Sequence, residues 1–97
     1  MNKIITYINF AKKSKSIVYG VDDILKSKKI ELVFISEELA ESGRKKVQKY
    51  TASNNIKEFL LDKNRFFELT QNPSIKVFGI TDKNLANAIK LNLTNKS

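Results

Sequence analysis

The chain has 97 residues, 41% of them hydrophobic, which fits one folded domain and excludes both a two-domain protein and a disordered chain. It contains no Cys and no His, so disulfides, thiolate nucleophiles and the commonest general base and metal ligand are absent. We therefore expect a protein that is not an enzyme and that holds no cofactor or metal. The formal net charge of +8 favours a polyanionic partner such as nucleic acid; the alternative is a lysine-rich surface that only keeps the protein soluble.

The apolar runs of the sequence are short. None approaches the roughly 20 residues that a helix needs to cross a bilayer. The stretch 1–10 does not have the form of a signal peptide, because it has no basic leader and polar residues interrupt its apolar part. The sequence thus predicts a cytoplasmic protein without a membrane partner.

Short apolar runs alternate with amphipathic stretches along the whole chain, as in α/β proteins. The run at 32–35 is apolar throughout, so we expect it at the centre of the sheet with both faces covered. Because helices separate the strands, they should cover both faces of the sheet. The prediction is a three-layer α/β/α sandwich, a single domain over 1–97, with a four-stranded mixed sheet. In chain order we expect a helix over 3–13, a strand over 17–19, a helix after Gly20, a strand over 32–35, a helix within 36–54, a strand over 56–61, a helix over 65–70, a strand over 75–80 and a last helix from 81 or 82.

The ends of these elements carry their own signals. Gly20 can adopt the positive φ of a tight turn between the first strand and the second helix. Asp62 suits the N-cap of the helix that follows it, and either Thr81 or Asp82 suits the N-cap of the last helix. The sequence at 72–74, Asn-Pro-Ser, is typical of a turn.

Aromatic residues can pack in the core or stack on nucleic-acid bases. Phe34, Phe59 and Phe78 lie within strand patterns, so we expect them in the core. Phe66 and Phe67 are adjacent in a short helix, which cannot bury both equally well. One of the two should therefore be exposed.

The charges are clustered along the chain. Residues 1–30 carry seven Lys against two Asp, residues 31–43 carry four Glu and no basic residue, and a second basic block follows at 44–49. Several lysines flank the strand that leads into Gly20, and Lys26 lies one helical turn beyond Asp22. We expect a positively charged edge around Gly20, where free backbone N–H groups can meet a phosphate. The alternative is an ordinary helix start, at which acids are favourable without any ligand.

Three segments resemble one known family. Residues 11–26 (AKKSKSIVYGVDDILK), 32–50 (LVFISEELAESGRKKVQKY) and 77–89 (VFGITDKNLANAI) are similar, in this order and spacing, to the ribosomal-protein family typified by L-seven-Ae and L-thirty-e. The similarity is greatest to its bacterial YlxQ-type branch and covers almost the whole chain. It implies a three-layer α/β/α fold and an RNA-binding role, often at kink-turns with tandem sheared G·A pairs. We also expect the protein to be a monomer. Its implied partners are ribosomal or other structured RNA and the ribosome or transcription and translation factors.

The resemblance also implies a site. Family members carry a Gly-x-Asn-Glu-x-x-Lys motif at the turn into the second helix, and here 20–26 reads GVDDILK. Gly20 and Lys26 match, whereas Asp22 and Asp23 stand where the motif has Asn and Glu. Gly20 is expected to let the backbone approach the RNA, and Lys26 to reach a guanine acceptor or a phosphate. The candidate RNA-binding residues are Lys12, Lys13, Lys15, Gly20, Val21, Asp22, Asp23, Lys26, Asn72 and Ser74.

Two departures from the family, Asp22-Asp23 and Phe66-Phe67, support a different hypothesis. Phe66-Phe67 replaces the Leu-Gly that is common in the fourth helix, and the loop 71–74 is polar where several kink-turn binders are apolar. An exposed Phe pair can anchor a protein partner. The alternative is therefore a protein-interaction adaptor that keeps the fold and has lost specific RNA recognition.

Overall fold

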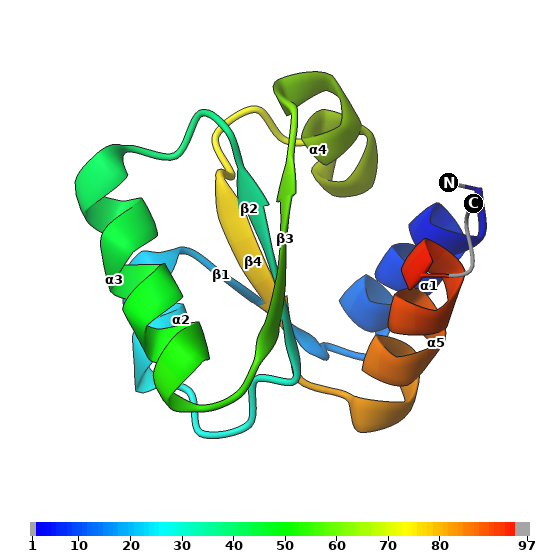
Figure 1. Cartoon of the computed structure of the whole chain (residues 1–97). Coiled ribbons are helices and arrows are strands. Elements are labelled where there is room, and N and C mark those ends of the chain that lie inside the picture. The colour runs from blue at the N-terminus through cyan, green and yellow to red at the C-terminus, as the bar shows by residue number, and fades with distance from the viewer. Residues whose placement is uncertain (1, 95–97) are drawn as a thin grey trace.

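The computed structural model describes residues 2–94 and the side chains of 3–93. It is a four-stranded mixed sheet between two layers of helices, which confirms the predicted α/β fold (Figure 1). No helix in this part of the chain has the length and apolar character needed to span a membrane. In chain order the elements are α1 (Asn2–Lys13), β1 (Ile17–Tyr19), α2 (Val21–Lys26), β2 (Leu32–Ser36), α3 (Glu41–Ser53), β3 (Lys57–Leu61), α4 (Lys63–Thr70), β4 (Val77–Ile80) and α5 (Lys83–Thr94).

The strands lie in the order β1-β4-β2-β3. β2 and β3 are parallel, whereas β4 runs antiparallel to both of its neighbours. All five residues of β2 are buried, which confirms its predicted place inside the sheet. Phe34 of β2 lies in register with Phe59 and Phe78 on the flanking strands, and their rings stack at centroid distances of 5.6 and 5.1 Å.

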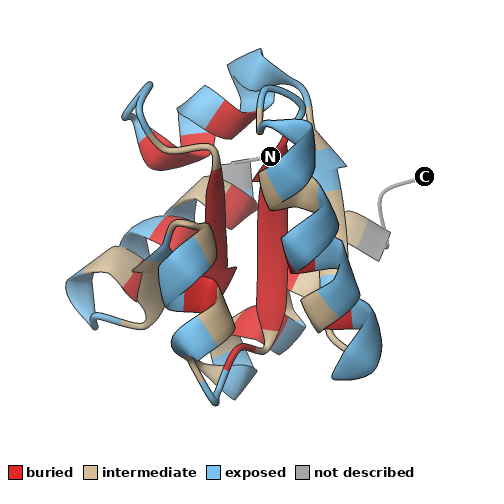
Figure 2. Ribbon diagram, turned by 90° about the vertical axis from the view of Figure 1, so that its left-hand side faces the viewer, coloured by how far each residue is buried: buried red, intermediate tan, exposed pale blue. Residues whose placement is uncertain are grey.

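Each face of the sheet has its own core, because successive side chains of a strand point to opposite faces. Leu32 and Phe34 of β2 pack under α1, α4 and α5, whereas Val33 and Ile35 pack under α2 and α3. Figure 2 shows the buried strands behind helices whose outer surfaces are exposed. The helices therefore divide into an α2/α3 layer and an α1/α4/α5 layer.

Aspartate side chains cap the N-terminal ends of two helices, as expected. Asp62 caps α4 by accepting a hydrogen bond from the Arg65 backbone N–H at 2.9 Å, and Asp82 caps α5 in the same way through Leu85 at 3.0 Å. The third helix lies within 36–54, as expected, and runs from Glu41 to Ser53. It begins at Glu41, because Ser36 completes β2 and the next four residues form the loop that leads to the outer layer.

The two adjacent phenylalanines of α4 have different environments. Phe66 is 2% exposed and its ring packs 5.4 Å from the ring of Phe78. Phe67 is 44% exposed. The expectation that one of them is exposed is confirmed, and the exposed one is Phe67.

Candidate nucleic-acid interface

Gly20 forms an open turn between β1 and α2. Its φ of 90° and ψ of 154° lie where a residue with a side chain is strained. Its N–H donates to the carbonyl of Val77 at 3.1 Å, and its own carbonyl accepts from the N–H of Ile24 at 3.1 Å. A Cβ at this position would meet no atom within 4 Å, so glycine is needed for its conformation and not for lack of space.

The Gly20 turn lies at one edge of the sheet, where four separate segments meet. The hydrogen bond to Val77 joins it to the start of β4, and the bond from Ser36 N–H to the Lys76 carbonyl (2.8 Å) joins that start to the end of β2. The Glu37 N–H donates to the Leu61 carbonyl at 2.8 Å and brings in the end of β3. We call this region the Gly20 edge and define it as residues 20–23, 36–38, 62–67 and 72–76.

The topology makes this edge suitable for a ligand. The parallel strands β2 and β3 end here side by side, and the helices that follow them go to opposite faces of the sheet (Figure 1). Open α/β sheets bind their ligands at such switch points, because the diverging connections leave a crevice. An open pocket of about 180 Å³ lies at this place. Its lining residues are Ser36, Glu38, Lys63, Asn64, Phe66, Phe67, Asn72, Pro73, Ile75 and Lys76.

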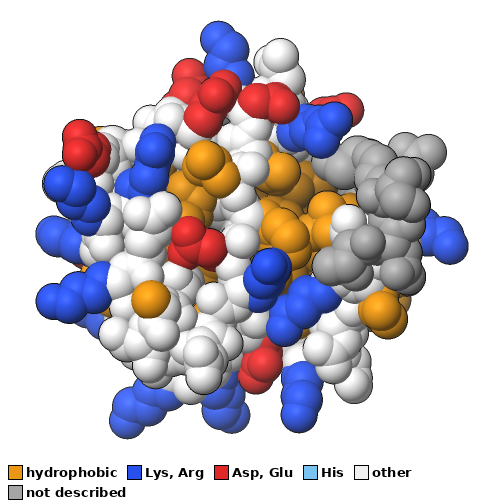
Figure 3. Space-filling model, in the orientation of Figure 1, with side chains coloured by type: hydrophobic (Ala, Val, Ile, Leu, Met, Phe, Trp, Pro, Cys, Tyr) orange, Lys and Arg blue, Asp and Glu red, His pale blue; other side chains and the backbone are white. Residues whose placement is uncertain are grey.

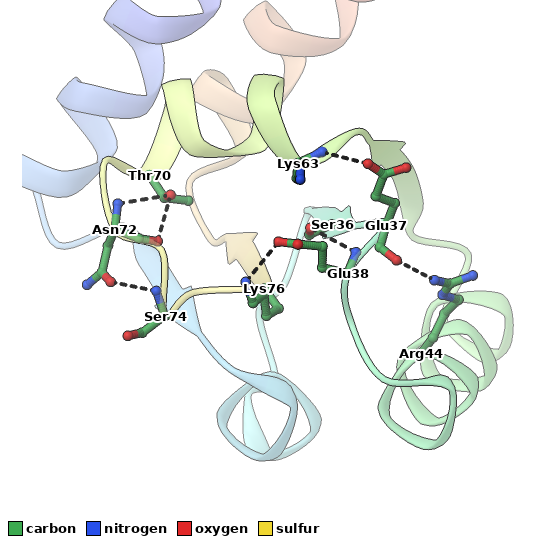
Figure 4. Close-up of polar contacts among 9 residues, drawn as sticks. All are labelled: Ser36, Glu37, Glu38, Arg44, Lys63, Thr70, Asn72, Ser74 and Lys76. Atoms are coloured by element: carbon green, nitrogen blue, oxygen red, sulfur yellow. Dashed lines mark hydrogen bonds and ion pairs between the residues drawn. The ribbon is translucent and has the colours of Figure 1, made fainter.

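The loop before β4 is held in shape by its own hydrogen bonds (Figure 4). The Thr70 hydroxyl, which is 6% exposed, donates to the Asn72 carbonyl at 3.2 Å and accepts from the Asn72 N–H at 3.3 Å. The Asn72 side-chain oxygen accepts from the Ser74 N–H at 2.9 Å. These contacts fix both candidate residues of the loop at the Gly20 edge.

Charged side chains also connect the segments of this edge by hydrogen bonds (Figure 4). Lys76 Nζ lies 3.0 Å from Glu38 Oε1, and this hydrogen bond and charge lower the pKa of Glu38 below its ordinary value. Glu37 Oε2 accepts from the Lys63 N–H at 3.0 Å, while Arg44 Nη2 donates to the Glu37 carbonyl at 2.9 Å. Because carboxylates of the protein already cap the first turn of α4, that helix end is not left for a phosphate.

The Gly20 edge is not the positively charged edge that the sequence predicts. Its carboxylates outnumber its cations, even when Arg44 beside it is included. The carboxylates are those of Asp22, Asp23, Glu37, Glu38 and Asp62, and the cations are those of Arg44, Lys63, Arg65 and Lys76. Repulsion between carboxylates and phosphates disfavours a phosphate ligand at this edge.

The expected lysines do not gather around Gly20. Lys12 donates to the carbonyls of Leu69 (2.9 Å) and Thr70 (3.3 Å) and so caps the C-terminal end of α4. Partial burial lowers the pKa of this lysine. Sequence reasoning missed this role because the bonded residues are 57 and 58 positions apart.

The other candidate lysines lie at different places. Lys13 is exposed on α1, and Lys15 lies at the opposite end of β1 from Gly20, about 10 Å of extended strand away. Lys26 is exposed at the end of α2, which covers the other face of the sheet from α1 (Figure 1). The structure thus brings the glycine turn and the loop at 72–74 to one edge, whereas the four lysines are spread over α1, the turn before β1 and the end of α2.

The remaining candidates belong to the turn itself. Asp22 and Asp23 are exposed in the first turn of α2, whereas Val21 is half-buried and packs on the α2/α3 core. Lys63, Asn64 and Phe67 also line the pocket, although the sequence analysis does not place them among the RNA-binding candidates. One sequence signal points to them: they follow a parallel strand, and the ends of parallel strands meet at one edge of a sheet.

Comparisons with known proteins give information on the fold but not on the function. No protein-family model and no curated protein matches the sequence. A solved structure of a protein with unknown function from Bacillus halodurans has the same fold, with a TM-score of 0.81 and 15% sequence identity. The match covers 96% of this chain and 98% of that one. The two chains thus share their whole architecture.

Proposed function

We propose that this protein binds structured RNA and contacts its bases at the Gly20 edge. The observation that carries the proposal is the pocket at the Gly20 edge, whose lining includes an exposed ring, amide side chains and lysines. Unpaired RNA bases are held by stacking on aromatic rings and by hydrogen bonds to their edges. Phe67 offers the ring, and Asn64 and Asn72 offer amide groups.

The carboxylates of the edge suit the same interpretation. Asp22 and Asp23 are exposed beside Gly20 and can accept hydrogen bonds from the amino groups of bases. The open space around Gly20 allows a ligand to approach the backbone closely. The resemblance of residues 20–26 to the kink-turn-binding motif supports RNA as that ligand.

A protein-interaction adaptor is the second candidate function. It is favoured by Phe67, which is 44% exposed, since exposed aromatic side chains commonly anchor partner proteins. Of the adjacent pair, Phe67 alone can serve as the anchor, because Phe66 is buried. A partner that remains bound to the protein after nuclease treatment would support this candidate over RNA binding.

Fluorescence anisotropy with a labelled kink-turn RNA hairpin tests the RNA proposal. Phe67→Ala should weaken binding roughly 5- to 150-fold, because stacking of one base on a ring is worth about 1–3 kcal/mol. Phe10→Ala is the matched control, since Phe10 is 61% exposed on α1, away from the edge. The proposal fails if the wild type does not bind the hairpin, or if the two variants bind it equally.

A further inference from the structure

The outer face of α3 carries lysines that no other element covers. α3 buries Val47 and Thr51 against the sheet, which turns Lys45, Lys46 and Lys49 to solvent. Residues three and four apart are neighbours on a helix surface, so these three side chains form one group. Figure 3 shows basic side chains along the left-hand margin of the molecule, where α3 lies in Figure 1.

Acidic groups neutralise little of this charge. Lys45 pairs with Glu41 at 3.2 Å, but both side chains are more than 70% exposed, and such pairs are weak. Within residues 2–94, Lys46 and Lys49 form no ion pair. The face thus keeps a positive potential, in contrast to the Gly20 edge.

The loop after α2 extends the same basic surface. The Tyr50 hydroxyl donates to the Ser27 carbonyl at 2.8 Å and ties this loop to α3. Lys28 and Lys29, the next residues of the loop, are both exposed. We define the α3 lysine face as Lys28, Lys29, Lys45, Lys46 and Lys49.

The α3 lysine face begins close to the Gly20 edge. α3 starts directly after the loop that follows β2, and Arg44 in its first turns donates to the Glu37 carbonyl at the edge. Lys45 and Lys49 lie four and eight residues beyond the first residue of α3, which is about 6 and 12 Å along the helix axis. A polymer seated at the edge can therefore continue along α3.

The chemistry of the face favours a phosphate backbone over a lipid surface. Helices that lie on membranes insert large apolar side chains beside their lysines. Neither α2 nor α3 has a large exposed apolar side chain in the described part of the chain. The large apolar side chains that are exposed in this part of the chain lie on other elements and are those of Phe10, Tyr19, Leu60, Phe67 and Leu91. Flexible lysine ammonium groups suit the irregular spacing of phosphates along a folded RNA.

We propose that the α3 lysine face binds the phosphate backbone of the same RNA whose bases the Gly20 edge contacts. This inference rests on the proposed function and divides its work between two surfaces. The Gly20 edge, which carries few positive charges, selects bases. The α3 lysine face supplies the electrostatic part of the affinity, which depends on salt.

The test measures how RNA affinity depends on salt. The triple variant Lys45→Gln, Lys46→Gln and Lys49→Gln is titrated with the labelled kink-turn hairpin over a series of KCl concentrations. Each lost phosphate contact reduces the slope of log K against log [salt] by about 0.7 to 0.9, so the triple variant should lose about 2 to 3 from the slope. Its thermal unfolding should match that of the wild type, since the three side chains are exposed.

A matched triple variant removes the same charge from the other face of the molecule. Lys3→Gln, Lys57→Gln and Lys83→Gln lie on α1, β3 and α5, and all three side chains are exposed. Lys57 lies over the ring of Phe59, which packs against the α1/α4/α5 core. This control should keep the wild-type slope. An equal loss of slope in both triple variants would overturn the inference, because net charge alone would then explain it.

Other outcomes separate this inference from the proposed function. If the wild type binds the hairpin and Phe67→Ala weakens it while the α3 triple variant keeps its slope, only the inference fails. If the wild type binds no RNA, both fail. Binding of the wild type to phosphatidylserine vesicles as tightly as to the hairpin would also overturn the phosphate-backbone assignment.

Discussion

Replacement of Gly79 by Ala tests how closely the chain packs over the middle of the sheet. Gly79 lies in β4 between Val18 of β1 and Val33 of β2. A Cβ at this position would lie 2.9 Å from Cδ1 and 3.2 Å from Cγ2 of Ile30, a residue that is only 6% exposed. Contacts between carbon atoms are normally about 3.5–4.0 Å. Rotation of the terminal methyl relieves the first overlap but not the second, because Cγ2 is attached to the branched and stiff Cβ.

We expect Gly79→Ala to lower the free energy of unfolding by about 1–3 kcal/mol, the usual cost of overpacking a core. For a domain of this size each kcal/mol lowers Tm by about 4–8 °C. Urea unfolding measures the change, with an unaltered m-value as the sign that the native fold is kept. Ile30→Val removes Cδ1 and should therefore cost less in the G79A background than in the wild type. Additive effects of the two substitutions, within about 0.5 kcal/mol, would refute the predicted clash.

Three further predictions concern the charged residues. Lys12→Met should lower the free energy of unfolding by about 1 kcal/mol through loss of the α4 cap and leave RNA affinity unchanged; weaker RNA binding at equal stability would contradict this. The pKa of Glu38 is lowered by Lys76, so the pair stabilises the fold above the ordinary Glu pKa of 4.5 and is lost as pH falls through the lower folded value. A carboxyl NMR titration should show this low midpoint, and Lys76→Met should raise it; equal midpoints would disprove the pairing. Asp22→Asn with Asp23→Glu completes the kink-turn-binding motif that residues 20–26 resemble and should tighten binding to the kink-turn hairpin about 10-fold by anisotropy, because an amide donor replaces a repelling carboxylate. Unchanged affinity would indicate that this turn does not contact the RNA.

The fold was largely predictable because its signals are local. The continuous apolar run at 32–35 indicated the buried strand β2, and Asp62 and Asp82 marked the first turns of α4 and α5. Each of these signals depends on residues only a few positions apart. The start of α3 was less clear, since nothing within 36–40 distinguishes a loop from a helix by its apolar spacing.

The candidate site was predictable only in part, because strand order decides which segments meet. Gly20 could be identified from the turn that it makes, but its neighbours at the edge come from the ends of β2 and β3 and from the loop before β4. The same long-range order gives Lys12 its partners at the end of α4. The adjacency of Phe66 and Phe67 predicts that one is exposed, but the place of Phe78 in the sheet determines which one.

At the open turn of Gly20, the cost of backbone strain can be measured without a steric clash. Its φ of 90° disfavours an L-residue, yet the space where a side chain would begin is empty. Gly20→Ala should therefore lower the free energy of unfolding by about 1–3 kcal/mol through backbone strain alone, because its methyl group meets no atom of the protein. The same methyl group would obstruct only a ligand that approaches the main chain of this turn within van der Waals distance.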